Sequence, residues 1–249
     1  AWIERAGGAL QDISVRPCVE HPTLLEAATD YLARHGHAAP RAVAIGIATP
    51  VTGDQVRMTN HPWSFSIAEL RRALGVERCL VINDFTALAL SLPLLKPADL
   101  RALGGGVPAP GAPLALLGPG TGLGVSALLP GPGVAGSALS GEGGHVTLAA
   151  VDDEEAALIA LLRKRFGHVS AERVLSGPGL INLYDAVCTL AGQAPRTLQP
   201  SELTRAAIDA SDADCVRTVR LFTGFLGGVA GDLVLTLGAR GGVYVGGGI

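Results

Sequence analysis

The sequence predicts an α/β protein built from two domains with a cleft between them. Short apolar runs typical of buried strands alternate with longer amphipathic segments typical of helices. The first part of the chain is small and mixed, whereas the later part is larger and richer in helical patterns. A stretch rich in proline and glycine, from Pro93 to Pro113, separates the two parts. We therefore expect domains at 1–94 and 95–249.

From about residue 40 onward, the first domain is expected to contain three strands and two helices. The strand-like apolar runs are 43–48, 55–58 and 79–82. Because residues 49–54 have turn chemistry, the first two strands are expected to form a hairpin. Ser66 with Glu69 three residues later matches a capping box, so a helix should start there and end at Gly75. A second helix is expected over 85–92.

The second domain is expected to open with a glycine-rich hairpin and to continue with helices. Strands at 114–117 and 125–129 flank the segment GPGTGLG, residues 118–124. The segment 153–166 has acidic residues in its first turn and basic residues in its last, which suits the helix dipole. Further helical patterns lie after Ser170 and at 178–190, 201–210 and 213–237, and a last strand begins near 241.

Composition narrows the functional classes. Apolar residues make up 48% of the chain and charged residues 16%, which indicates a globular protein. With a net charge of −3 and no basic stripe, nucleic acid is not an expected partner. The most apolar region, 221–237, is interrupted by glycines and Asp232, so neither a membrane span nor a signal peptide is expected. Four cysteines without a C-x-x-C spacing predict free thiols in the cytoplasm.

The segment GPGTGLG is a candidate phosphate loop. Its glycines allow backbone N–H groups to approach an anion, and Thr121 adds a hydroxyl donor. A turn with no ligand explains the glycines equally well. The spacing matches neither the G-x-G-x-x-G fingerprint nor a Walker A loop, because Val125 replaces the third glycine and no Gly-Lys-Ser/Thr follows.

Asn83 and Asp84 form a second candidate site, at the end of the strand 79–82. Asp84 as the cap of the next helix is the simpler interpretation. A carboxylate at this place is also suited to accept the proton of a hydroxyl group that attacks phosphorus.

Two further segments carry polar side chains in glycine-rich surroundings. In GEGGH (141–145), Glu142 and His145 are able to accept from and donate to neighbouring hydroxyls of a polyol, although an ordinary polar turn is the alternative. One His and one Glu are too few for a metal site. Glu172 lies in the first turn of a helix, where an acid is expected for the dipole alone. In the loop after residue 58, Trp63 is expected to pack and Asn60 to reach the cleft.

Several segments together resemble the bacterial glucokinase family, the group without the zinc-binding cysteine cluster. They occur in the family's order and cover most of the chain from about residue 40 onward: TPVTGDQVRMTNHPWSFSIAEL, VINDFTALAL, LGPGTGLGVSAL, LSGEGGHVTLAA, GHVSAERVLSGPGLINLY and GGVYVGGGI. The resemblance implies the two-domain α/β fold of the actin/hexokinase type, which is ribonuclease H-like and has an interdomain cleft. It also implies ATP-dependent phosphorylation of glucose at the 6-hydroxyl, with Mg²⁺, in the cytoplasm, by a homodimer.

The resemblance also assigns roles to individual residues. It implies that Asp84 is the catalytic base. The implied ligands of the glucose hydroxyls are Asn83, Asp84, Glu142, His145 and Glu172. The implied second phosphate loop is Gly120, Thr121 and Gly122, and the implied start of the adenosine-binding turn is Gly246, Gly247 and Gly248.

The chain departs from the family pattern at both ends. The family begins with a strand and a phosphate loop of the form D-x-G-G-T-N, whereas this chain begins with AWIERAGGALQDI, which resembles the strand after that loop. Helices that follow the GGGI turn in the family are also absent, so we expect both ends to be truncated. Two alternatives stay open: a non-catalytic sugar-binding or regulatory protein on the same fold, and a kinase for another hexose.

Overall fold

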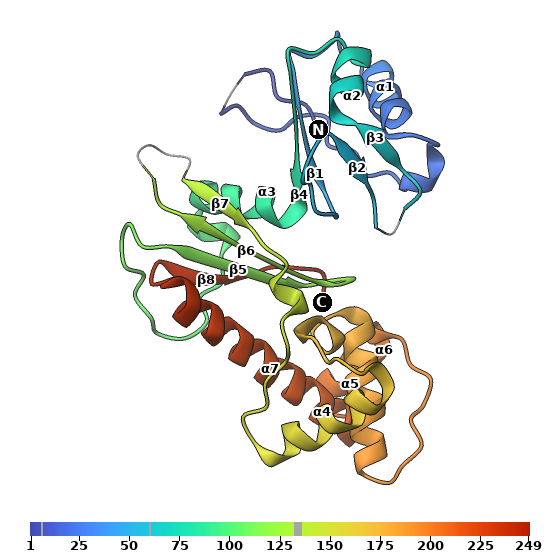
Figure 1. Ribbon diagram of the computed structural model, residues 1–249, viewed down its shortest axis with the longest axis vertical. Helices are drawn as coiled ribbons and strands as arrows, with labels where there is room; N and C mark the ends of the chain where they lie inside the picture. Colours follow the sequence, from blue (N-terminus) through green and yellow to red (C-terminus); the bar gives the residue numbers. More distant parts are fainter. Residues whose placement is uncertain (6, 60, 132–135) are drawn as a thin grey trace. The chain divides into compact units, whose positions relative to one another are not determined.

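The computed structural model describes residues 1–5, 7–59, 61–131 and 136–249. The chain folds into two compact units, Ala1–Asp84 and Phe85–Ile249 (Figure 1). The unit boundary therefore lies before the helix over 85–92, whereas the sequence placed the domain boundary after Leu94. The reason is packing: Phe85, Ala89 and Leu92 belong to an apolar cluster whose other members lie in the second unit.

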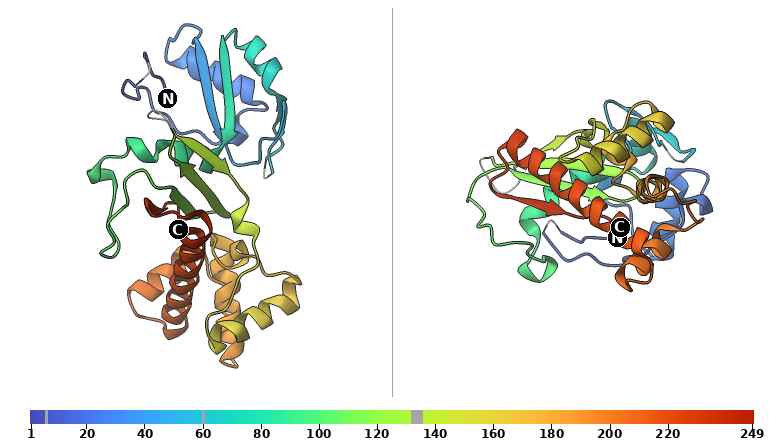
Figure 2. Two further views of the ribbon diagram at one scale, coloured as in Figure 1. Left: turned by 60° about the vertical axis from the view of Figure 1, so that its left-hand side comes forward. Right: turned by 90° about the horizontal axis from the view of Figure 1, so that it is seen from below.

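The described residues of the first unit form two helices and two small sheets. The helices are α1 (Leu24–Arg34) and α2 (Ile67–Ala73), preceded by the 3-10 turn η1 (Cys18–Glu20). The strands are β1 (Ala42–Ile47), β2 (Gln55–Arg57), β3 (Ser64–Ser66) and β4 (Arg78–Asn83). β1 and β4 run parallel, with Ile47 opposite Asn83, and β2 pairs with β3 in antiparallel orientation (Figure 2).

The prediction of a hairpin between the first two strands is wrong. β1 pairs with β4 and β2 pairs with β3, which is a short strand that the sequence pattern did not reveal. A side chain joins the turn after β1 to the end of β2: the Thr49 hydroxyl donates to the Arg57 carbonyl at 3.0 Å. Turn chemistry identified the chain reversal, but the partner of β1 is a strand more than thirty residues later.

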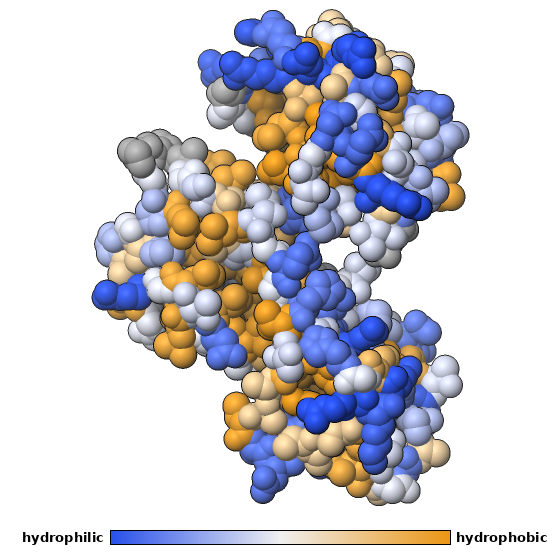
Figure 3. Space-filling model, viewed as in Figure 1, coloured by the Kyte–Doolittle hydropathy of each residue, from blue (hydrophilic) through white to orange (hydrophobic). Residues whose placement is uncertain are grey.

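The capping box predicted the start of α2 correctly. The Ser66 hydroxyl accepts from the Glu69 amide at 3.1 Å, and the helix stops before Gly75, whose φ is +65°. The segment before α1 differs from the expected strand. The only β-structure among its described residues is an isolated bridge between Trp2 and Gln11, and Val15 is 93% exposed. Apolar side chains are accordingly visible among hydrophilic ones on the viewed face of this unit (Figure 3).

The second unit is built on a four-stranded sheet with the order β7-β6-β5-β8. Its strands are β5 (Leu114–Pro119), β6 (Leu123–Leu129), β7 (Ser137–Ser140) and β8 (Gly242–Val245). β5 and β6 form the predicted glycine-rich hairpin, and β8 joins β5 in parallel. Helix α3 (Asp84–Ser91) and the 3-10 turns η2 (Leu92–Leu94) and η3 (Pro97–Asp99) precede the sheet.

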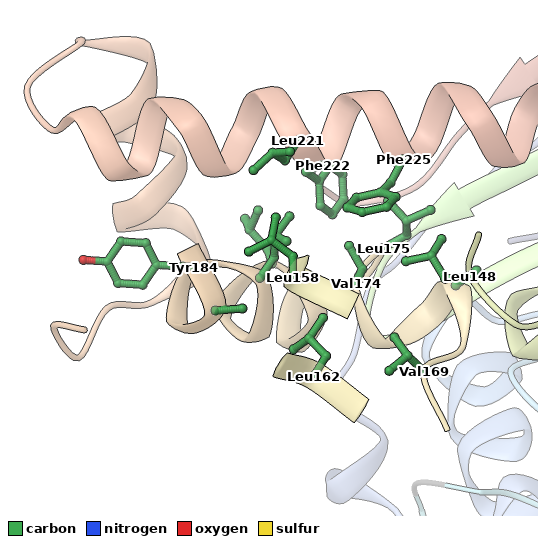
Figure 4. Close-up of a cluster of buried hydrophobic side chains, with 14 of the residues drawn as sticks. Leu148, Leu158, Leu162, Val169, Val174, Leu175, Tyr184, Leu221, Phe222 and Phe225 are labelled. Carbon is green, nitrogen blue, oxygen red and sulfur yellow. The ribbon is translucent and has the colours of Figure 1, made fainter. Parts of the chain in front are cut away.

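The remaining helices form the main core. They are α4 (Asp153–Phe166), α5 (Gly177–Leu190), α6 (Pro200–Ile208) and α7 (Ala213–Leu237), with the 3-10 turns η4 (Gly143–His145) and η5 (Ala171–Arg173). Leu158 of α4 is fully buried, and Phe222 and Phe225 of α7 point toward the same cluster (Figure 4). Leu123, Ala171 and Val174 also belong to this core, so it holds in place the β6 start and the η5 turn, which lie next to candidate residues.

Helix α7 is long and apolar enough to cross a membrane by length and composition, although the sequence pattern argued against a span. Its buried side chains include Cys215, Thr218 and Phe225, and the helix contacts α5 and α6. A helix with one buried apolar face is also typical of the core of a globular domain.

Candidate functional site

Asn83 ends strand β4 and Asp84 begins helix α3, so the two side chains lie at a strand-to-helix junction. The helix starts at Asp84 itself, one residue earlier than expected, and both residues are half-buried. The Asn83 amide nitrogen donates to Asp84 Oδ1 at 3.0 Å, which orients the carboxylate. Asn83 and Asp84 close the first unit, and the other candidate residues belong to the second unit.

Phe85 packs against the glycine-rich hairpin of the second unit. Gly118 and Gly124 face each other across β5 and β6. A Cβ atom on Gly118 would lie 2.7 Å from Phe85 Cζ, and one on Gly124 would lie 2.1 Å from Phe85 Cδ2 and Cε2. The ring therefore rests directly on the hairpin backbone, and only glycine leaves room for it at these two positions. Phe85 follows Asp84 in the chain, so this packing is one peptide bond away from the candidate base.

The predicted phosphate loop forms the tip of this hairpin. Within it the Gly120 amide donates to the Gly122 carbonyl at 2.8 Å, and Thr121 is exposed. The Gly120 carbonyl accepts from the Gly177 amide at 2.8 Å, which joins the loop to the first turn of α5. Ser176 caps that helix by accepting from the Gly179 amide. The loop therefore lies beside the positive end of the α5 dipole, which is a suitable environment for phosphate.

The glycine turn after β8 lies along the same hairpin. The Gly246 amide donates to the Leu117 carbonyl at 3.0 Å, and the Gly248 amide donates to the Pro119 carbonyl at 3.1 Å. Gly247 has a φ of +136°. The structure thus brings together the two segments that resemble a phosphate loop and an adenosine-binding turn.

A pocket of about 670 Å³ opens between these segments and the start of α5. It contains three of the expected nucleotide-binding residues: Gly120, Thr121 and Gly248. It also contains residues that the sequence analysis missed: Gly177, Pro178, Ile181, Asn182, Leu198, Gln199, Pro200 and Ile249. Apolar walls with a few polar groups are typical of a small-molecule site. No local pattern indicated Asn182 or Gln199, because Asn182 lies within ordinary helical sequence and Gln199 is the residue that precedes α6.

Glu142 precedes the 3-10 turn η4 and His145 is its last residue, and the turn packs against the beginning of β6. Both side chains are exposed, and His145 Nε2 lies 3.8 Å from Glu142 Oε2. A Cβ atom on Gly144 would lie 2.2 Å from the Leu123 carbonyl oxygen, so the turn depends on close backbone approach. Close backbone approach explains the glycines of this segment, and it places Glu142 and His145 near the hairpin tip.

Glu172 is the residue that connects these segments. Its Oε2 accepts from the Leu123 amide at 2.9 Å, immediately after the phosphate loop. The backbone on either side of η5 is also hydrogen-bonded to the chain that follows η4: the Ala171 amide donates to Val146 and the Leu148 amide to Val169. Turns η4 and η5 and the hairpin tip therefore form one polar site in the second unit.

Three points remain: the roles of Trp63 and Asn60, and the question of a metal site. Trp63 is buried and its Nε1 donates to the His21 carbonyl at 3.0 Å, which confirms its packing role. Asn60 lies outside the described residues. Among the residues that the structure describes, no group of three or more His, Cys, Asp or Glu side chains is arranged to hold a metal ion.

The comparisons with known proteins identify the family. A family model described as Glucokinase matches residues 1–249. The chain is 58% identical to a glucokinase of Aromatoleum aromaticum over 93% of this chain and 70% of that protein. It is 51% identical to a glucokinase of Chromobacterium violaceum over 99% of this chain and 71% of that protein. The crystal structure of a glucokinase from an Antarctic psychrotroph superposes with a TM-score of 0.84, at 36% identity, over 94% of this chain and 72% of that one.

Proposed function

The chain belongs to the glucokinase family, and we propose that Asp84 is the general base with which it phosphorylates glucose at the 6-hydroxyl from ATP. The actin/hexokinase-type α/β fold expected from the sequence is confirmed by the structural likeness. The observation that carries the assignment of the site is the joint position of the hairpin tip, η4 and η5 in the second unit.

The donor, ATP, is proposed to bind along the hairpin tip. Backbone amides of Thr121 and Gly122 would hold phosphate oxygens. Gly120, whose own amide closes the loop, and the positive end of the α5 dipole would lie beside them. The Gly246–Gly248 turn would border the nucleoside, with Asn182 and Gln199 as polar groups in the pocket wall. Mg²⁺ is proposed to enter with the nucleotide, since this ion is usually held by phosphates, waters and one or two carboxylates. When bound, it supplies partial neutralisation of the phosphate charge.

The acceptor, glucose, is proposed to be held through its hydroxyl groups. Carboxylates Glu142 and Glu172 would accept hydroxyl hydrogens, and His145 would donate or accept according to its tautomer. Asn83 would fix the hydroxyl group next to the base. Two carboxylates and an imidazole on adjoining turns suit a polyol, because a sugar presents several neighbouring donors and acceptors.

The reaction requires the hydroxyl to lose its proton as its oxygen attacks the γ-phosphorus. Asp84 takes that proton, the bond between the γ-phosphorus and its bridging oxygen breaks, and ADP leaves. The hydrogen bond from Asn83 to Oδ1 fixes the rotation of the Asp84 carboxylate. Since an ionised carboxylate accepts at about four lone-pair sites on its two oxygens, this orienting bond and the catalytic task do not compete.

The test is Asp84→Asn in the full chain, assayed by coupling glucose 6-phosphate formation to NADPH. We expect kcat to fall by about 10²–10⁴-fold, the usual contribution of a general base. Glucose affinity should change little, because the amide oxygen still accepts from Asn83. Asp153→Asn, an exposed carboxylate in the first turn of α4, is the matched control. Normal turnover in Asp84→Asn would remove Asp84 from the role of base.

The same assay with mannose, fructose and N-acetylglucosamine tests the preference for glucose. If glucose binds and no sugar is phosphorylated, the non-catalytic alternative replaces the kinase. Homodimerisation, cytoplasmic location and the lack of a nucleic-acid partner stay predictions, and sedimentation velocity is the measurement for the first of them.

A further inference from the structure

Glu172 makes a contact that binding a sugar does not require. Its Oε2 accepts from the Leu123 amide at 2.9 Å, and Leu123 is the first residue after the Gly120–Gly122 loop. A Cβ atom on Gly122 would lie 2.4 Å from the same Oε2, so the carboxylate is also in close contact with the loop backbone. Glu172 is half-buried and comes from a segment 49 residues away in the chain.

We propose that Glu172 is a positioning residue for the donor phosphate loop as well as a ligand of the acceptor, so that one carboxylate couples the two substrate sites. This inference rests on the proposed function and adds a second role to one of its residues. The carboxylate holds the Leu123 amide and thereby the end of the loop whose amides would face phosphate. Its other lone-pair sites stay available to a sugar hydroxyl, since an ionised carboxylate has about four.

Different hydrogen bonds hold the two ends of the Gly120–Gly122 loop. Its own hydrogen bond, from the Gly120 amide to the Gly122 carbonyl, closes the turn, and the Gly177 amide holds the Gly120 carbonyl. Glu172 holds the opposite end of the loop, at Leu123. By linkage, a sugar that fixes the Glu172 carboxylate should favour nucleotide binding, and a nucleotide should favour sugar binding by the same factor.

The experiment compares Glu172→Ala with Glu172→Gln in the full chain. Glutamine keeps a carbonyl oxygen that can accept from the Leu123 amide, whereas alanine leaves that amide without its side-chain acceptor. Binding of a non-hydrolysable ATP analogue is measured calorimetrically without sugar, and glucose binding is measured without nucleotide. We expect the analogue's Kd to rise about tenfold in Glu172→Ala, as for loss of a hydrogen bond to a charged group, and less than about threefold in Glu172→Gln. Both variants should bind glucose more weakly.

The outcomes separate this inference from the proposed function. Equal affinity for the analogue in Glu172→Ala, Glu172→Gln and the parent would show that Glu172 does not position the loop. Unchanged glucose affinity in both variants would remove Glu172 from the acceptor site, while the analogue measurements would still decide its effect on the loop. Thermal unfolding of each variant identifies any general loss of structure.

A second pair of variants tests the contact from the loop side. Gly122→Ala places its Cβ against the Glu172 carboxylate, so glucose affinity without nucleotide should fall even though Gly122 is in the donor loop. Gly227→Ala, at an exposed position of α7 outside the site, is the control, because a Cβ there meets no atom within 4 Å and should not change that glucose affinity. Equal glucose binding by Gly122→Ala and the parent would overturn the coupling.

Discussion

The packing of Phe85 on the glycine-rich hairpin gives a double-mutant cycle whose outcome follows from the structure. In Gly124→Ala the new Cβ would lie 2.1 Å from Phe85 Cδ2 and Cε2, whereas carbon atoms in contact are about 3.5–4.0 Å apart. The ring or the strand must therefore move by more than about 1 Å, and overpacking of this kind typically costs about 1–3 kcal/mol. Phe85→Ala alone should cost about 2 kcal/mol, below the usual range for a fully buried ring because this ring is half-buried.

In the double variant the clash no longer exists, because the ring that the new Cβ would meet has been removed. The double variant should therefore be more stable than the sum of the single effects by about 1–2 kcal/mol, a coupling in the range found for residues in contact. Urea unfolding of the full chain, followed by circular dichroism, measures each corner of the cycle.

Gly118→Ala is the control for this cycle. A Cβ at Gly118 would lie 1.9 Å from the Gly246 carbonyl oxygen, a backbone atom that Phe85→Ala does not remove. Phe85→Ala should therefore fail to rescue Gly118→Ala while it rescues Gly124→Ala. Additive effects at Phe85 and Gly124 would refute the claim that the ring packs on this hairpin.

Three further predictions concern the core and the helix ends. In the native protein Cys18 should react quickly with a thiol reagent and Cys215 should not, because burial raises the pKa of the Cys215 thiol to about 11; thiol counting with DTNB checks this. Asp212→Ala should cost about 1 kcal/mol in urea unfolding, because Asp212 caps α7 by accepting from the Cys215 amide. The hydrogen bond from that backbone amide lowers the pKa of Asp212 below its ordinary 3.8. The stabilisation by the cap is therefore present above pH 3.8 and is lost as the pH falls through the lowered pKa. The cost of Asp212→Ala should thus be smaller in urea unfolding at pH 2 than at pH 6. Leu158→Ala should cost about 2–5 kcal/mol, since this side chain is fully buried, and a smaller loss would mean that the core collapses around the site.

Local chemistry was sufficient to predict most helices and the glycine-rich hairpin. The bounds expected for α4 and α7 agree with the structure, because a side-chain cap and the 3.6-residue periodicity act within a few residues of the chain. The end of β4 was predicted to within one residue for the same reason, since the apolar run stops at Ile82 and the strand ends at Asn83.

Strand pairing could not be predicted in this way. The turn after β1 suggested a hairpin, yet β1 pairs with β4, which follows a helix and two other strands. The short strands β3 and β7 carry no distinct alternation, so only the partner strands β2 and β6 define them.

The sequence by itself determined which residue types occur at the candidate site: a carboxylate after a strand, a glycine-rich hairpin, and acids in two short turns. Only the tertiary structure decided that Glu172 contacts the Leu123 amide and that Asn182 and Gln199 share a pocket with Thr121. The physical reason is distance along the chain. Caps and periodicity are set by residues a few positions apart, whereas these contacts form only after the core of α4, α5 and α7 has brought remote segments together.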